Sequence, residues 1–151
     1  MLVMNIVKTI EQYNIKNVYF SEPIKNNIMN DGTFTRIIYS TNTFVLNGIF
    51  LFITLIPTYI DKYYNKYKYF FDVKQNKDII DQLQLIESNI LSQHSIKNKV
   101  PQYKIKEQLE SGFIKFFDET INKSDNSFIL KISGIWENDT NYGITYKFTK
   151  I

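Results

Sequence analysis

The fold is decided by the stretch Phe128-Ile-Leu-Lys-Ile-Ser-Gly-Ile-Trp-Glu-Asn-Asp-Thr-Asn-Tyr-Gly-Ile-Thr-Tyr-Lys-Phe148. Apolar and polar side chains alternate in both of its arms, and a polar loop at 137–141 separates the arms. Because successive side chains of a strand point to opposite faces, this alternation predicts a β-hairpin. One face of the first arm is expected to carry Phe128, Leu130, Ile132 and Trp136, opposite Lys131, Ser133 and Ile135. One face of the second arm is expected to carry Tyr142, Ile144, Tyr146 and Phe148, opposite Thr145, Lys147 and Thr149.

Patterns upstream of this hairpin predict further strands and two helices. Strands are expected at 17–20, 33–40, 43–55, 63–73 and 113–117, with a turn at Asn30-Asp-Gly32 and a strand end at Pro57. Residues 1–24 are otherwise ambiguous. A helix is indicated by the spacing of Ile79, Leu83, Ile86 and Ile90, with Asn76 as its N-cap and its end near His94. A shorter helix is expected at 104–110, ended by Gly112.

Together these elements predict a mainly β domain with one or two helices, which spans residues 1–151 as one unit. The expected architecture is a small closed or partly open barrel, like an OB-fold. A chain of 151 residues, 44% of them hydrophobic, is long enough to bury a core. The absence of cysteine excludes disulfide scaffolds and thiolate metal sites. The net charge is only +3, so the chain lacks the strongly basic footprint of a duplex-binding protein.

The candidate binding segment is Lys62-Tyr-Tyr-Asn-Lys-Tyr-Lys-Tyr-Phe-Phe-Asp-Val-Lys74, which interleaves lysines with aromatic rings. Taken as one strand from Tyr63 to Val73, it has a core-like odd-numbered face and an even-numbered face that meets solvent. Single-stranded nucleic acid is bound by lysines that contact phosphates and rings on which bases stack. We expect stacking by Tyr64 and Phe70, and phosphate contacts by Lys66, Lys68 and Lys74. Arg36, Lys131 and Lys147 are expected to extend the basic surface.

A second interpretation of the same segment is compositional. The chain has no alanine and a single arginine, and it is rich in Ile, Asn, Lys, Tyr and Phe. These residues are typical of a genome rich in A and T, and coding bias alone then accounts for the lysines and tyrosines. Both interpretations stay open at this point.

No residue pattern indicates catalysis. His94 is the only histidine, so a histidine-based triad or a multi-histidine metal site has no partners, and we expect it solvated at a helix end. The five glycines are scattered and form no phosphate-binding loop. Asp118-Glu119 is explained as a solvated pair, and Trp136 as a core residue. We therefore expect a protein that is not an enzyme and uses no metal or other cofactor.

The order of elements resembles that of the OB-fold single-stranded-DNA-binding proteins of large DNA viruses and tailed phages. The closest local likeness is the stretch from Leu130 to Phe148, which is similar to the strand pair that closes the barrel in those domains. The resemblance implies sequence-indifferent binding of single-stranded DNA in viral DNA replication. Those proteins usually carry an acidic C-terminal tail, whereas this sequence ends at Thr149-Lys-Ile151, so either such a tail lies beyond it or the role differs.

The alternative function is a viral structural, assembly or protein-interaction module with an aromatic-rich β surface. RNA is the alternative nucleic-acid ligand, and a homo-oligomer or a viral replication partner is the alternative kind of complex. The apolar start, Met1 to Val7, is too short for a signal peptide, and the apolar run from Ile49 to Pro57 is too short to span a bilayer. The expectation is therefore an intracellular protein of the host cytoplasm or viral factory, neither secreted nor bound to a membrane.

Overall fold

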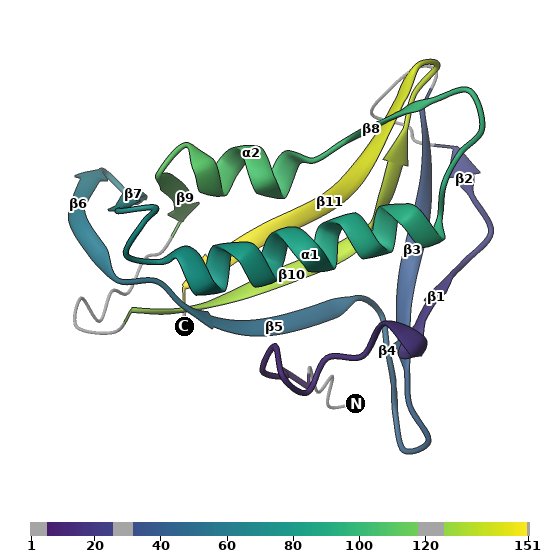
Figure 1. Cartoon of the computed structure of the whole chain (residues 1–151), viewed down its shortest axis with the longest axis horizontal. Coiled ribbons are helices and arrows are strands. Elements are labelled where there is room, and N and C mark those ends of the chain that lie inside the picture. Colours follow the sequence, from purple (N-terminus) through teal and green to yellow (C-terminus); the bar gives the residue numbers. More distant parts are fainter. Residues whose placement is uncertain (1–5, 26–31, 118–125, 151) are drawn as a thin grey trace.

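The computed structural model describes residues 6–25, 32–117 and 126–150, and it is mainly β with two α-helices. A strongly curled sheet forms a partly open barrel, as expected from the sequence (Figure 1). The helical segments are η1 (Ile15–Asn17), α1 (Lys77–Gln93) and α2 (Lys104–Glu110). The strands are β1 (Val18–Phe20), β2 (Ile24–Lys25), β3 (Thr33–Ser40), β4 (Val45–Leu46), β5 (Ile49–Thr54), β6 (Pro57–Tyr63), β7 (Lys66–Phe71), β8 (Val100–Gln102), β9 (Phe113–Phe117), β10 (Ser127–Glu137) and β11 (Asn141–Lys150).

The predicted C-terminal hairpin is confirmed, and its first strand is the centre of the large sheet. On one side, β10 pairs with β11 along its length. On the other side it pairs first with β5 and then, from Gly134 onward, with β3. The long strand β10 therefore pairs along one edge with two shorter strands, β5 and β3, which lie end to end. This arrangement curls the sheet.

A β-bulge at Ser133 marks the change of partner, where the register between β10 and β11 shifts. The bulge reverses the expected faces beyond it. Ile135 occupies the core at 1% exposure, while Trp136 is only half-buried, so the sequence assignment of these two residues was wrong. A glycine is required at position 134, where β10 begins to pair with β3, because a Cβ there would lie 2.3 Å from the carbonyl oxygen of Thr35.

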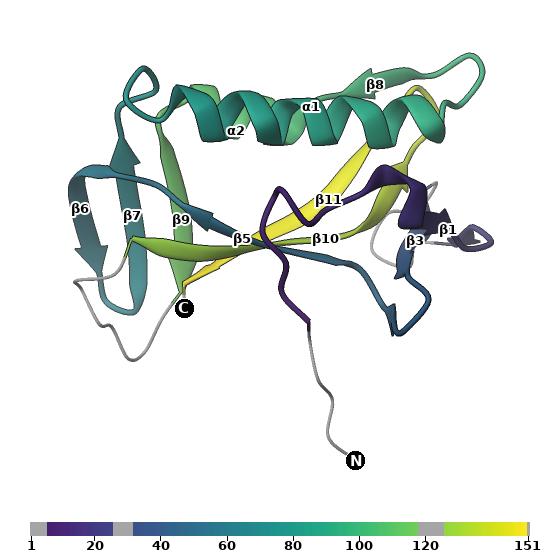
Figure 2. The same cartoon turned by 60° about the horizontal axis from the view of Figure 1, so that its bottom comes forward.

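A smaller three-stranded sheet has the order β6-β7-β9 and lies at one end of the molecule (Figure 2). Its buried face carries Tyr67, Tyr69 and Phe71 of β7, as the alternation predicted. The Tyr69 hydroxyl donates a hydrogen bond to the Leu55 carbonyl at 2.5 Å, and its ring meets the Phe128 ring edge-on at 4.8 Å. These contacts fix the small sheet to the strands of the large one.

The two helices lie on one side of the curled sheet (Figure 2). The expected helix positions are confirmed, with α1 ending before His94 and α2 spanning Lys104–Glu110. α1 buries Ile80, Leu83, Ile86, Ile90 and Leu91, whereas Ile79 is only partly buried.

Asn76 precedes α1 as predicted, but its side chain does not cap the helix. Instead it accepts a hydrogen bond from the Ile56 N–H and donates to the carbonyl oxygens of Ile56 and Asp72. It therefore joins the link between β5 and β6 to the start of the helix.

Two expected strands are each divided in the structure. The segment 43–55 breaks at Asn47-Gly48, where Gly48 has a φ of +116°, into β4 and β5. The segment 63–73 is part of a hairpin, because the chain turns at Tyr64-Asn65 between β6 and β7. Pro57 begins β6 rather than only ending the strand before it. Asn30 and Asp31 of the predicted turn at Asn30-Asp-Gly32 lie outside the described residues.

The N-terminal segment, ambiguous from sequence, runs beside β5. Lys8 forms a parallel bridge with Leu51, and its backbone bonds with Phe50 and Phe52. The Lys8 side chain is buried with its ammonium 4.2 Å from the centre of the Tyr39 ring. Burial lowers the pKa of Lys8, because the charged form loses its hydration.

Candidate nucleic-acid interface

The outer surface of the small sheet brings rings and lysines together from three strands. Directly opposed residues of antiparallel strands share a face, so the strand register defines this surface. Opposite Phe70 lie Tyr59 and Phe113, opposite Lys68 lie Asp61 and Lys115, and opposite Lys66 lies Tyr63. We call these eight residues the small-sheet face.

One end of the small-sheet face is a row of three rings across the three strands. The ring centres of Tyr59 and Phe70 are 5.6 Å apart, and those of Phe70 and Phe113 are 5.9 Å apart. Tyr59 is 59% exposed, and the two phenylalanines are partly exposed. Neighbouring rings at this spacing offer a continuous apolar platform to a flat ligand.

Lysines border this row of rings. The Lys68 ammonium lies 4.2 Å from the centre of the Phe113 ring and 5.1 Å from that of Phe70. The Lys115 ammonium lies 5.8 Å from the Phe113 ring. Cation–π contacts of this kind hold a lysine near a ring while it stays charged. Positive charge and stacking surface are therefore adjacent on the small-sheet face.

Exposed tyrosines stand at the other end, where β6 turns into β7. Tyr64 adopts a φ of 55° in the turn and is 96% exposed. Tyr63 is also exposed, and a hydrogen bond with the Asp61 carboxylate raises its pKa. The Asp61 charge is thereby engaged by a neighbour on its own strand.

A pocket of about 330 Å³ opens among the lysines near this turn. Its lining is formed by Tyr63, Lys66, Tyr67, Lys68 and Lys115. Three ammonium-bearing side chains thus line one concavity, and none of the described residues in its lining is a carboxylate.

The structure brings four of the predicted site residues together and separates the other four. Tyr64, Lys66, Lys68 and Phe70 lie on the small-sheet face or at its turn, although Tyr64 is in the turn rather than on a strand. Lys74 lies beyond β7, in the turn before α1, where its N–H donates to the Asp72 carboxylate. The expected single strand from Tyr63 to Val73 is therefore wrong, because the chain turns at Tyr64-Asn65 and β7 ends at Phe71.

The remaining three predicted residues belong to the large sheet. Lys131 and Lys147 are direct cross-strand partners, and the Lys131 ammonium lies 5.6 Å from the Phe50 ring. Arg36 is exposed on β3 opposite Gly134. Lys131 and Lys147 form a second basic surface, and neither these lysines nor Arg36 belongs to the small-sheet face.

Sequence reasoning missed Tyr59, Phe113 and Lys115, which are as central to the small-sheet face as the predicted residues. Lys115 and Phe113 lie in β9, a strand that was predicted, but the sequence pattern of β9 does not indicate which strand it pairs with. Tyr59 lies just after Pro57, where no strand was expected. The alternation of Tyr59, Asp61 and Tyr63 is the signal that could have indicated β6.

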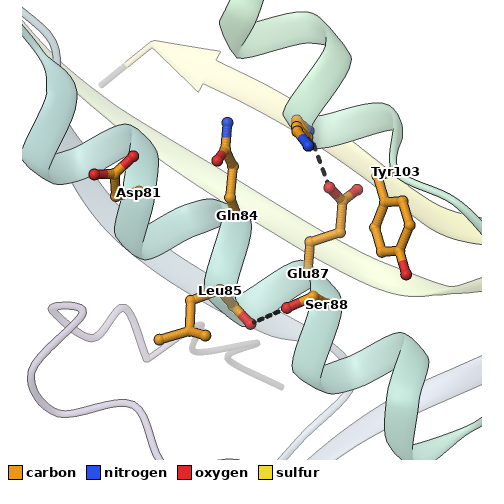
Figure 3. Close-up of a pocket in the computed structure, with 7 residues that line it drawn as sticks. Asp81, Gln84, Leu85, Glu87, Ser88 and Tyr103 are labelled. Carbon is orange, nitrogen blue, oxygen red and sulfur yellow. Dashed lines mark hydrogen bonds between the residues drawn. The ribbon is translucent and has the colours of Figure 1, made fainter. Parts of the chain in front are cut away.

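A second pocket, of about 400 Å³, lies between α1 and the start of α2 (Figure 3). Its floor includes Glu87, which is fully buried and accepts hydrogen bonds from the N–H groups of Ile105 and Lys106 at 2.8 and 2.9 Å. Glu87 thus supplies the acceptors that the first turn of α2 needs. Burial raises the pKa of Glu87, and the two backbone hydrogen bonds only partly offset this effect. The carboxyl group is therefore committed to holding the helices together.

His94 is not solvated as expected. Its ring packs 4.5 Å from that of Phe20, and burial lowers its pKa. Beside it, Glu137 has a lowered pKa because it accepts hydrogen bonds from Lys99 and Thr33.

Within the described part of the chain, no three His, Cys, Asp or Glu side chains are grouped to hold a metal ion. None of the helices in that part is long and apolar enough to cross a membrane.

The fold and this surface define a partly open β-barrel with an aromatic and basic face. Compared with models of protein families, with curated proteins and with solved structures, the chain matches none of them. The resemblance to the viral and phage OB-fold proteins therefore stays a prediction.

Proposed function

We propose that this protein binds single-stranded DNA without sequence specificity, through the small-sheet face and without catalysing a reaction. The observation that carries the proposal is the row of rings formed by Tyr59, Phe70 and Phe113, bordered by Lys68 and Lys115. Bases stack on rings whatever their identity, and lysines contact the repeating phosphates. A role in viral DNA replication is the setting that the sequence resemblance implies.

The ligand expected is a single strand rather than a duplex. In a duplex the base faces are stacked inside the helix and are not available to protein rings. The small-sheet face offers four rings, with Lys66, Lys68 and Lys115 as its cations and Asp61 as its anion. This charge is modest, so stacking must supply much of the affinity, and stacking needs unpaired bases.

Fluorescence anisotropy of a labelled oligothymidine of about 12 nucleotides tests the proposal. A duplex of equal length and an oligouridine serve as ligand controls. The proposal predicts saturable binding of the single strand, weaker binding of the duplex, and loss of binding when Lys66→Glu and Lys68→Glu are combined. The matched control combines Lys16→Glu with Lys97→Glu, which changes the charge equally at exposed positions outside both sheets.

No binding of the single strand at low salt would overturn the proposal. Equal loss in the two double variants would overturn the site, because net charge rather than the small-sheet face would then govern binding. Circular dichroism of each variant establishes that the fold is kept.

Protein association is the second candidate, favoured by the exposed edge of the small sheet. β6 is an outer strand of that sheet, and it exposes Tyr59, Ile60 and Tyr63. Tyrosine is enriched at protein interfaces as well as at nucleic-acid interfaces. If the protein associates with another protein, Tyr59→Ala should weaken that association, whereas Lys66→Glu combined with Lys68→Glu should not. If the protein binds DNA, both changes should weaken DNA binding.

A further inference from the structure

We infer that Tyr64, at the tip of the β6–β7 hairpin, is a separate stacking residue that holds a base of the bound strand beyond the row of rings. This inference rests on the proposed function, because the row of rings holds the rest of the strand. It adds a binding residue that is not part of the small-sheet face and that the fold itself does not need.

The backbone conformation at Tyr64 is unfavourable for a tyrosine. Its φ is 55°, and the only other non-glycine residue with a positive φ in the described part of the chain is Asn98, with a φ of 69°. Asparagine adopts this left-handed conformation comparatively often, whereas for a bulky side chain it is an outlier. Hairpin turns ordinarily place glycine, asparagine or aspartate where φ is positive. Folding alone would therefore favour another residue at position 64.

Burial of the ring does not offset this strain. A tyrosine stabilises a fold mainly by burying its ring, but Tyr64 is 96% exposed. A strained residue that brings the fold no benefit points to a functional contact. An exposed ring suits the proposed ligand, because every base has a face that can stack on it.

The place of Tyr64 fits a strand that continues from the row of rings. Tyr64 directly follows Tyr63, which belongs to the small-sheet face. The distance along β7 from Phe70, in the row of rings, to Lys66, at the start of the strand, is about 13 Å. Stacked nucleotides repeat about every 3.4 Å along one strand, so about four nucleotides or fewer cover this distance. An oligothymidine of about 12 nucleotides is therefore long enough to reach both the row of rings and Tyr64.

The test measures the binding and the stability of four variants. Tyr64→Gly and Tyr64→Asn remove the ring and suit the left-handed backbone, Tyr64→Trp keeps a ring, and Asn98→Gly is the matched control at the other exposed position with a positive φ. In anisotropy titrations with the same oligothymidine, we expect Tyr64→Gly and Tyr64→Asn to bind about 5- to 150-fold more weakly than wild type, because one stacked base is lost. Tyr64→Trp should bind at least as tightly as wild type, and Asn98→Gly should bind equally tightly.

The melting temperature separates a binding role of Tyr64 from a structural one. Tyr64→Gly and Tyr64→Asn should keep the melting temperature of wild type or raise it by up to about 4 °C, since the strain is removed. Loss of the ring should thus weaken binding while the fold keeps or gains stability. A lower melting temperature in both variants would overturn the inference, because Tyr64 would then support the fold.

The wild-type titration separates this inference from the proposed function. If wild type binds and both Tyr64→Gly and Tyr64→Asn bind equally well, the stacking role of Tyr64 is overturned, the proposed function stands, and coding bias accounts for the tyrosine. If Tyr64→Trp binds as weakly as Tyr64→Asn, the ring is not the group that binds, and the stacking role is again overturned. If wild type does not bind, both proposals fall.

Discussion

The salt dependence of DNA binding is the prediction that the structure specifies most closely. Each phosphate neutralised by a lysine releases counterions, so the logarithm of the binding constant falls linearly with the logarithm of salt concentration. For single strands the slope is about −0.7 for each neutralised phosphate. The small-sheet face carries Lys66, Lys68 and Lys115. If each contacts one phosphate, the slope is about −2.1, and affinity falls about 18-fold between about 50 and about 200 mM salt.

Lys115→Gln provides the quantitative test. Lys115 is exposed and reaches only the edge of the ring row, so its replacement should leave the fold intact. The slope should change to about −1.4, and the loss of affinity over the same salt range should fall to about sevenfold.

Anisotropy titrations of an unphosphorylated oligothymidine at four or more salt concentrations, of order 50 to 200 mM, measure these slopes. Lys147→Gln is the control, and its slope should equal that of the unmodified protein. A wild-type slope near −5 would refute the reasoning, because it would require the second basic surface. An unchanged slope in Lys115→Gln would refute the assignment of that residue.

Three further predictions concern the fold that supports the face. The stability contributed by Glu87 should be fullest below its ordinary pKa of 4.5 and should be lost as pH rises through its raised folded-state pKa. The difference in unfolding free energy between wild type and Glu87→Gln, measured in urea, should therefore fall with rising pH. A difference that grows with pH would contradict the burial effect. Tyr69→Phe should cost about 1–3 kcal/mol in the same assay, because the Leu55 carbonyl loses its buried donor, and a neutral result would show that another group replaces it. Gly134→Ala should cost about 2 kcal/mol or more, since its Cβ would lie 2.3 Å from the Thr35 oxygen, and an unchanged melting temperature would mean that β3 can move away.

Local patterns predicted most elements because those elements follow local rules. Helix α2, strand β3 and the C-terminal hairpin lie where capping, β-branched content and alternation placed them. The bulge at Ser133 was missed because alternation is assumed to continue until a signal stops it. Gly134 is that signal in retrospect, yet its need for a missing Cβ arises from β3, which is about 100 residues away in sequence.

The candidate site was only half predictable, for a topological reason. Lys66, Lys68 and Phe70 share a face by simple alternation, and the structure confirms that placement. Their neighbours Tyr59 and Phe113 come from strands whose pairing depends on the whole fold. The turn at Tyr64-Asn65 was missed because it contains no glycine, and a non-glycine residue with positive φ is uncommon.

Backbone amide NMR of the isotope-labelled protein, titrated with unphosphorylated oligothymidine, tests the central claim most directly, because it reports binding and location together. The proposed function predicts that the largest shifts fall on β6, β7 and β9, with Tyr59, Lys68, Phe70 and Phe113 among them. Shifts concentrated around Lys131 and Lys147 on the large sheet, or no shifts at low salt, would contradict it.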